Sequence, residues 1–283
     1  MLRAFGLAVA LCASSASASD LAFDRHGWSS KLPGFGGLSG LELSADGRDL
    51  LAVTDRGTLI RAQLDRGQGG ALTNIAILAL EPLRDPRGAP LVEEYRDAEA
   101  LAADGAGGVY VAFEFHHRIW HYPGPDTLPE PVPRAAWMDG LPDNKGVEAL
   151  AYHPNHGLIA ITETPGPDGA FAIQSFQDGT WRRRGTLPAS GGFQVTGADF
   201  AQDGTLYIVE RKLGLLGFRT RLRRRDPTGE VETIFASEQG DFDNLEAVST
   251  WRDAAGMLRL TLLSDDNFLA FQRTEIIEFS LTE

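Results

Sequence analysis

The sequence has 283 residues, with 39 acidic and 26 basic side chains, a formal net charge of −13 and a single cysteine. The acid excess disfavours non-specific contact with phosphate backbones, so we expect no nucleic-acid partner. One cysteine cannot form an intramolecular disulfide. The length fits one large domain that is stabilised by its own core, by a metal, or by both.

The first 19 residues have the composition of a secretory signal peptide. Arg3 is followed by an apolar run at residues 4–13 and by small residues that end in Ala16-Ser17-Ala18, which is the usual order of charged region, hydrophobic region and cleavage site. The run is too short to span a bilayer, and no later stretch approaches the ~18 apolar residues of a spanning helix. We therefore expect residues 1–19 to be removed, the protein to be periplasmic or secreted, and residues 20–283 to form a single domain without a membrane span.

The rest of the chain reads as an all-β protein with an internal repeat. Short runs of Val, Ile, Leu, Phe and Tyr alternate with Gly, Asp, Asn and Pro turns, and no segment shows a helical period. Five stretches resemble one another, and each reads as a hairpin: LSGLELSADGRDLLAVTDRG, DAEALAADGAGGVYVAFEF, GVEALAYHPNHGLIAITET, VTGADFAQDGTLYIVERK and NLEAVSTWRDAAGMLRLTLLSDDNF.

Each hairpin carries two acids. The acids of the first strands are spaced by 57, 49, 51 and 47 residues, close to the ~40–50 residues of a four-stranded propeller blade: Glu42, Glu99, Glu148, Asp199 and Glu246. A second acid closes each hairpin: Asp55, Glu114, Glu163, Glu210 and Asp265. The midpoint of every pair falls on the turn, so both acids should lie at the same end of the hairpin. Because inner strands line the central channel of a propeller, we expect two carboxylate rings at one mouth of that channel.

The repeats predict a five-bladed β-propeller, with a degenerate sixth blade as the alternative. Each of the first four hairpins is followed by two further strands, but the last is followed only by TEIIEFSL at residues 274–281. The segment DLAFDRHG at residues 20–27 would then supply the missing outer strand and close the ring.

Two carboxylate rings need compensating charge. Like charges about 4 Å apart repel by about 4 kcal/mol at an effective dielectric of about 20, so the rings require a cation, basic partners or protonation. Ca²⁺ prefers oxygen ligands, and the candidate ligands are Glu42, Glu99, Glu148, Asp199, Glu246, Asp265, Asp266 and Asn267. The alternative is a metal-free network balanced by neighbouring basic residues, namely Arg56, Lys145, Arg211 and Lys212.

Other site chemistries find less support. HHRIWH places His117 and His121 on one strand face and His116 on the other, but without the cysteines or the helical spacing of a zinc site. The stretch GGLSGLE leads into a strand, whereas the serine of a nucleophile elbow precedes a helix.

The hairpins also resemble a known family, the phytase-like domain with esterase-like activity. The resemblance covers nearly the whole chain after the leader, from GGLSGLELSADG through TDRG, DAEALA, NKGVEALA and NLEAVS to LLSDDNF. Its most specific parts are residues 144–148 and 264–268. The resemblance implies a propeller whose site lies at the acidic mouth. The chain has no Asp-Asp-Pro-Ala stretch of the kind found in calcium-dependent alkaline phytases, which argues against phytase activity itself.

We therefore expect an exported, metal-dependent hydrolase, with Ca²⁺ as its cofactor, that cleaves an ester or phosphoester in the acidic funnel. A ring carboxylate with a raised pKa can activate water, and the candidates are Glu99, Glu148 and Glu246. A small-molecule substrate, if anionic, would be held by basic residues, with Arg56, Lys145, Arg118 and Arg211 as candidates. The alternatives are a non-catalytic propeller that binds a ligand or a protein, and a Ca²⁺-dependent lactonase-type propeller. We expect a monomer.

Overall fold

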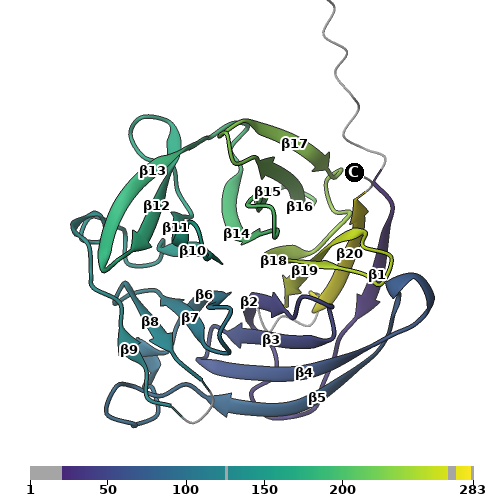
Figure 1. Ribbon diagram of the computed structural model, residues 1–283, viewed down its shortest axis with the longest axis horizontal. Coiled ribbons are helices and arrows are strands. Elements are labelled where there is room, and N and C mark those ends of the chain that lie inside the picture. Colours follow the sequence, from purple (N-terminus) through teal and green to yellow (C-terminus); the bar gives the residue numbers. More distant parts are fainter. Residues whose placement is uncertain (1–20, 125–126, 267–271, 282–283) are drawn as a thin grey trace, which may run out of the picture.

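The computed structural model describes residues 21–124, 127–266 and 272–281, which form five four-stranded antiparallel sheets. The sheets are arranged as blades around a common axis (Figure 1). Three short 3-10 turns, Gln68–Gly70, Glu93–Tyr95 and Ala136–Met138, are the helical segments of this part of the chain. The expected leader at residues 1–19 lies outside the described residues. Within them, no helix has the length and apolar character needed to cross a membrane.

The first four blades follow the chain in order, each from its inner to its outer strand. Blade 1 consists of β2 (Leu38–Leu43), β3 (Asp49–Thr54), β4 (Thr58–Arg66) and β5 (Leu72–Pro82). Blade 2 consists of β6 (Ala98–Ala103), β7 (Val109–Phe113), β8 (Arg118–Tyr122) and β9 (Glu130–Pro131). Blade 3 consists of β10 (Val147–His153), β11 (Gly157–Thr162), β12 (Ala170–Gln177) and β13 (Thr180–Pro188). Blade 4 consists of β14 (Gln194–Phe200), β15 (Leu206–Gly214), β16 (Gly217–Arg225) and β17 (Val231–Ala236).

Blade 5 joins the two ends of the chain. It consists of β18 (Asn244–Arg252), β19 (Leu258–Asp265), β20 (Glu275–Leu281) and β1 (Phe23–Gly27). β1 pairs antiparallel with β20, with Phe23 opposite Phe279. The Phe23 ring also lies 5.0 Å from that of Phe242. The predicted five-bladed ring, closed by the N-terminal strand, is therefore confirmed, and the described residues leave no segment for a sixth blade.

The hydrophobic core lies where neighbouring blades face each other. Along β4, Ile60, Ala62 and Leu64 are buried, with less buried residues between them, which is the two-residue period of a strand. Ile60 and Leu64 belong to one cluster with Trp251 and Leu263 of blade 5. Each blade is thus held by the blades beside it.

The innermost strands approach one another closely near the axis. A small residue occupies the same register position in each of them: Gly40, Ala100, Ala149, Gly197 and Ala247. A Cβ on Gly40 would lie 2.8 Å from the backbone nitrogen of Leu101, and a Cβ on Gly197 would lie 2.9 Å from the Cα of Ala247. Backbone atoms of adjacent blades therefore exclude larger side chains here.

Replacing Gly40 with alanine should lower the free energy of unfolding by about 1–3 kcal/mol, because the added methyl group forces backbone of blades 1 and 2 apart. Gly27→Ala is the matched control, since a Cβ at Gly27 meets no atom within 4 Å. Urea unfolding of both variants measures the difference. Equal effects at the two positions would contradict the close approach of the inner strands.

Candidate functional site

A β-bulge recurs at the same place in all five inner hairpins. The register skips one residue in each inner strand, and the skipped residues are Ser39, Glu99, Glu148, Thr196 and Glu246. A bulge leaves its extra residue outside the ladder and re-aims the side chain. In three blades the re-aimed side chain is a glutamate. Glu148 and Glu246 line the same small cavity on the axis, so the bulges bring the predicted catalytic acids together at one channel mouth.

Glu42 and Asp199 do not join this ring, in contrast to the sequence expectation. Each lies three residues after the bulge, where the equivalent residue of blade 5 is Ser249. Glu42 accepts a hydrogen bond from the backbone nitrogen of Ala103 at 3.0 Å, and Asp199 accepts one from that of Thr250 at 2.6 Å. Both acids therefore connect neighbouring blades. The prediction that the first acids of all five hairpins are equivalent is wrong, because blades 1 and 4 carry Ser and Thr at the bulge.

A second set of side chains lies on the second strand of each inner hairpin or directly after it, one residue beyond the pair that precedes the bulge. Four are the acids predicted from the sequence, Asp55, Glu114, Glu163 and Asp265, and the fifth is Arg211. The expected fifth acid, Glu210, lies one residue earlier and therefore faces the other side of its sheet. There it is fully buried and pairs with Arg221 and Arg223 at 2.6 and 2.5 Å.

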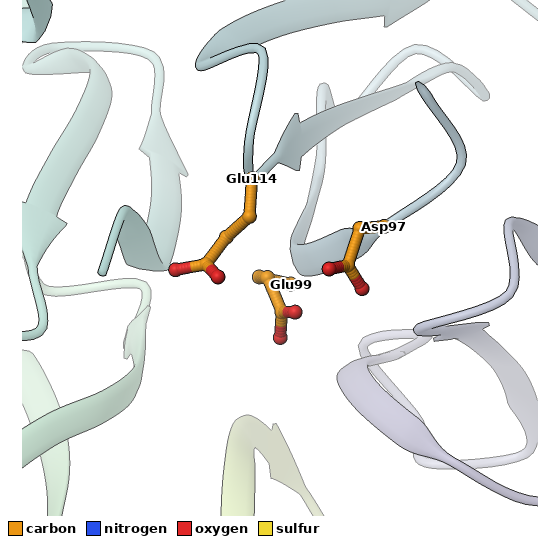
Figure 2. A group of neighbouring side chains, drawn as sticks. All are labelled: Asp97, Glu99 and Glu114. Atoms are coloured by element: carbon orange, nitrogen blue, oxygen red, sulfur yellow. The ribbon is translucent and has the colours of Figure 1, made fainter. Parts of the chain in front are cut away.

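Three carboxylates of blade 2 form the tightest acidic group in the described chain. Asp97 directly precedes β6, Glu99 is the second residue of β6, and Glu114 follows β7. Figure 2 shows the three side chains gathered at this point. Each offers an oxygen atom within 4.8 Å of the other two. Two ligands of one Ca²⁺, each about 2.4 Å from the ion, are separated by no more than about 5 Å, so a single cation can bridge this group.

The acids at the mouth have raised pKa values. Burial raises the pKa of Glu99 well above its usual range, and repulsion from other carboxylates, Glu148 first, adds to the effect. For Glu148, burial and then Glu246 raise the pKa. Burial is also the largest cause that raises the pKa of Glu114, Glu246 and Asp55 to about 7. At neutral pH these groups must therefore either retain protons or neutralise their charge with a cation.

Two basic side chains lie among these acids. Arg211 donates hydrogen bonds to Asn244 and Glu246, and it lies 3.9 Å from Glu163. Burial acts to lower the pKa of Arg211, but the surrounding carboxylates outweigh it and raise the pKa. Lys145 pairs with Glu163 at 3.1 Å. Of the predicted substrate-binding residues, these two lie in the site.

The other two predicted basic residues have different surroundings. Arg56 is exposed and follows Asp55, whose pKa its charge acts to lower. The guanidinium group of Arg118 lies over the ring of Phe113 at 4.1 Å and that of Trp120 at 4.5 Å. Burial lowers the pKa of Arg118 to about 10. This arginine therefore packs against aromatic side chains of blade 2, and none of the mouth acids is among the groups that shift its pKa.

The remaining predicted ligands lie at the end of blade 5. Asp265 is opposite Asn244 in the register, and its charge raises the pKa of Glu246. Asp266 accepts a hydrogen bond from the backbone nitrogen of Gly37 at 3.2 Å, which ties blade 5 to the start of blade 1. Asn267 lies outside the described residues.

Sequence reasoning missed two polar residues of the site. Asp97 and Asn244 each stand two residues before a bulged glutamate, and the side-chain nitrogen of Asn244 donates to Glu246 at 2.5 Å. The shared spacing, Asp-Ala-Glu and Asn-Leu-Glu, was the signal that could have identified them. The histidines of HHRIWH do not form a common site: His117 bonds the carbonyl oxygen of Pro142 at 2.9 Å, and His121 pairs with Asp104 at 2.8 Å.

The channel is closed beneath the acids. Apolar side chains two residues after each bulge line the axis together: Leu41, Leu101, Leu150, Ala198 and Val248. The cavity that they share with Glu148 and Glu246 has a volume of about 10 Å³, which is room for one water molecule. A ligand can therefore reach the acids only from the open mouth.

A family model described as "Phytase-like: Esterase-like activity of phytase" matches residues 33–268. No curated protein matches the sequence. A solved structure of a candidate gluconolactonase is similar, with a TM-score of 0.52 and 12% identity over 89% of this chain and 78% of its own. A gluconolactonase from Xanthomonas campestris gives a TM-score of 0.46 and 12% identity over 86% and 72% of the two chains. At such identities the first likeness supports the shared fold alone.

We expect the melting temperature of chelator-treated protein to fall as the pH rises from about 5 to about 8. The mouth acids with a pKa of about 7 hold protons in the folded state that the unfolded chain has already lost, so stability decreases as the pH rises through this window. Ca²⁺ should raise the melting temperature more at about pH 8, where it competes with fewer protons. Differential scanning calorimetry measures both effects, and a melting curve that Ca²⁺ leaves unchanged at either pH would contradict a metal site.

Proposed function

The chain belongs to the phytase-like family, and we propose that it is a hydrolase that cleaves an ester or phosphoester bond at the acidic channel mouth with the help of a bound Ca²⁺. The observation that carries the proposal is the group of Asp97, Glu99 and Glu114, whose oxygens lie within 4.8 Å of one another. Such a group is costly unless a cation or protons compensate it. The closed channel supports a single route for substrate, through this mouth.

The residues at the mouth fit a hard cation. They offer carboxylate oxygens, the ligand type that Ca²⁺ prefers, and the neighbouring Asp55 has a buried oxygen, Oδ1, without a hydrogen-bond partner. When bound, such an ion supplies Lewis acidity and makes a water molecule more acidic. The residues that would hold it are Asp97, Glu99 and Glu114, with Asp55 beside them.

Glu148 and Glu246 are then available for proton transfer. Burial and then the charges of Glu246 and Glu114 raise the pKa of Glu148, and a raised pKa suits a carboxyl group that both accepts and donates a proton near neutral pH. Glu148 would take a proton from the attacking water and return it to the leaving oxygen, so the proton count is conserved over the cycle. Arg211 would hold Glu246 in place and offer positive charge to an anionic substrate group.

We also propose that the enzyme is exported and acts on a small molecule. The order of charge, apolar run and small residues in the first 19 positions supports a cleaved leader and a periplasmic or secreted enzyme. Residues 20–283 would then act as one domain. A lactone is a cyclic ester, so a lactonase falls within the proposal and differs only in substrate.

Glu148→Gln should lower kcat by about 10²–10⁴, which is the usual contribution of a general acid or base, while Ca²⁺ binding is largely kept. Glu99→Gln should instead weaken Ca²⁺ binding, because it removes charge from the group that holds the ion. Aryl esters, phosphoesters and lactones are assayed with and without chelator, and Ca²⁺ affinity is measured by titration calorimetry.

Glu42→Gln is the matched control for both variants. Glu42 is also buried, but it accepts a backbone hydrogen bond that an amide oxygen can still accept. It should therefore retain hydrolysis and Ca²⁺ affinity. Hydrolysis that is equally low in all three variants, or absent from the wild-type protein with every substrate class, would leave a non-catalytic binding role instead.

A further inference from the structure

One hairpin projects beyond the acidic mouth. β15 continues for four residues after Glu210, to Gly214, whereas the equivalent strands of blades 1 to 3 end at the position that matches Glu210. At about 3.3 Å per residue the extension is about 13 Å. The β15–β16 hairpin therefore extends farther than the equivalent strands of blades 1 to 3, with Arg211 of the site at its base.

The tip of this hairpin is apolar and exposed. Leu213, Leu215 and Leu216 have 68%, 97% and 79% of their surface in solvent. A single exposed leucine is ordinary, but three within four residues at a projecting tip form a feature that usually meets another apolar phase.

The tip is also held in a fixed shape. With its side-chain oxygen turned toward the tip, Gln239 accepts hydrogen bonds from the backbone nitrogens of Leu215 and Leu216 at 2.9 and 2.6 Å. The backbone nitrogen of Gly240 donates to the carbonyl oxygen of Phe218 at 2.8 Å. The leucines are therefore presented to the outside and do not fold back onto the blade.

Two basic residues stand just behind the leucines. Lys212 and Arg219 are exposed and lie directly opposite each other on the two strands of the hairpin, where like charges destabilise strand pairing. Their positive charges are only partly neutralised. Lys212 donates to a neutral group, the carbonyl oxygen of Gly191, at 2.8 Å, and Arg219 lies 3.9 Å from the exposed carboxylate of Glu238. An apolar tip with basic residues directly behind it is an arrangement that suits a lipid surface, where the tip enters the apolar layer and the basic side chains meet the phosphate groups.

Other exposed apolar residues lie at the same end of the propeller. Leu32, Val92 and Phe115 are in the connections that border the mouth. Phe115 has a backbone φ of 54° and is fixed there by a hydrogen bond to the carbonyl oxygen of Asp143 at 2.9 Å, a conformation that is unusual for a bulky residue. At the opposite end of the inner hairpins, the turns consist mostly of Gly, Ala, Pro and polar residues, and the exposed large apolar residue among them is Met257 of the β18–β19 turn, at 37%.

We propose that the mouth end of the propeller docks on a phospholipid surface, with the β15–β16 tip inserted among the lipids. Leu213, Leu215 and Leu216 enter the apolar layer, and Lys212 and Arg219 contact lipid phosphates. A convex two-residue turn has no groove that could enclose a small ligand, so a fluid apolar phase is the environment that buries all three leucines together. This inference does not depend on hydrolysis.

The test is flotation of the full-length protein with phosphatidylcholine vesicles, alone and mixed with phosphatidylglycerol. Wild-type protein should float with the vesicles, and the double variant Leu215→Ser, Leu216→Ser should bind at least tenfold more weakly. Leu78→Ser is the matched control, because Leu78 is 65% exposed on β5, the outer strand of blade 1 (Figure 1). Replacing Lys212 and Arg219 with serine should weaken binding further when phosphatidylglycerol is present.

Folding and activity separate this result from a structural defect. The double leucine variant should keep the wild-type melting temperature and, if the wild-type protein hydrolyses a soluble ester, the wild-type turnover of that ester. Wild-type protein that stays in the aqueous fraction with both vesicle types, or a double variant that floats like the wild type, would overturn the proposal. If the wild-type protein is a dimer that does not bind vesicles, and the double variant is a monomer, the tip contacts a second copy of the chain. That result would overturn the proposal as well.

Discussion

The close approach of five inner strands around one axis is the constraint on which the rest of the structure depends. The space between Gly40 and Leu101, or between Gly197 and Ala247, admits no larger side chain. A functional side chain therefore cannot occupy this register position of the ladder. The β-bulge at the mouth end of each inner strand solves this problem, because it turns one residue per blade out of the ladder and toward the opening.

Buried acids occur in two settings in this protein, and the setting distinguishes acids that stabilise the fold from acids of the candidate site. Glu210 has two arginines, while Glu42 and Asp199 have backbone nitrogens of the next blade. These acids hold strands and blades together. Glu99 at the mouth is instead surrounded chiefly by other carboxylates, which raise its pKa after burial itself. A carboxylate without a dedicated structural partner is costly to keep, and a site for a ligand accounts for that cost.

The sequence predicts the fold well and the site only in part. Hairpin repeats and the missing last strand lead to five blades and to closure by the N-terminal strand, because both follow from strand periodicity and counting. The bulge is invisible to such counting, so Glu42 and Asp199 were assigned to the ring although they lie three residues past it. Arg211 illustrates the same limit. In β15 the acid Glu210 stands one residue before the position where the other four blades have an acid, and Arg211 occupies that position. Adjacent residues of a strand face opposite sides of the sheet, so the two side chains have different surroundings.

The pairing of β1 with β20 has a consequence for how the protein folds. Phe23 and Phe279 are neighbours in space but lie near the two ends of the chain, so this contact closes the longest loop in the molecule. Closing so long a loop is slow, because the loss of chain entropy is offset only by contacts that form when the remaining blades are in place. Until then β20 has one open edge, and a chain that stops before residue 275 leaves β1 without its partner. Unpaired strand edges recruit other chains, so incomplete copies of this protein should aggregate while complete ones close on themselves.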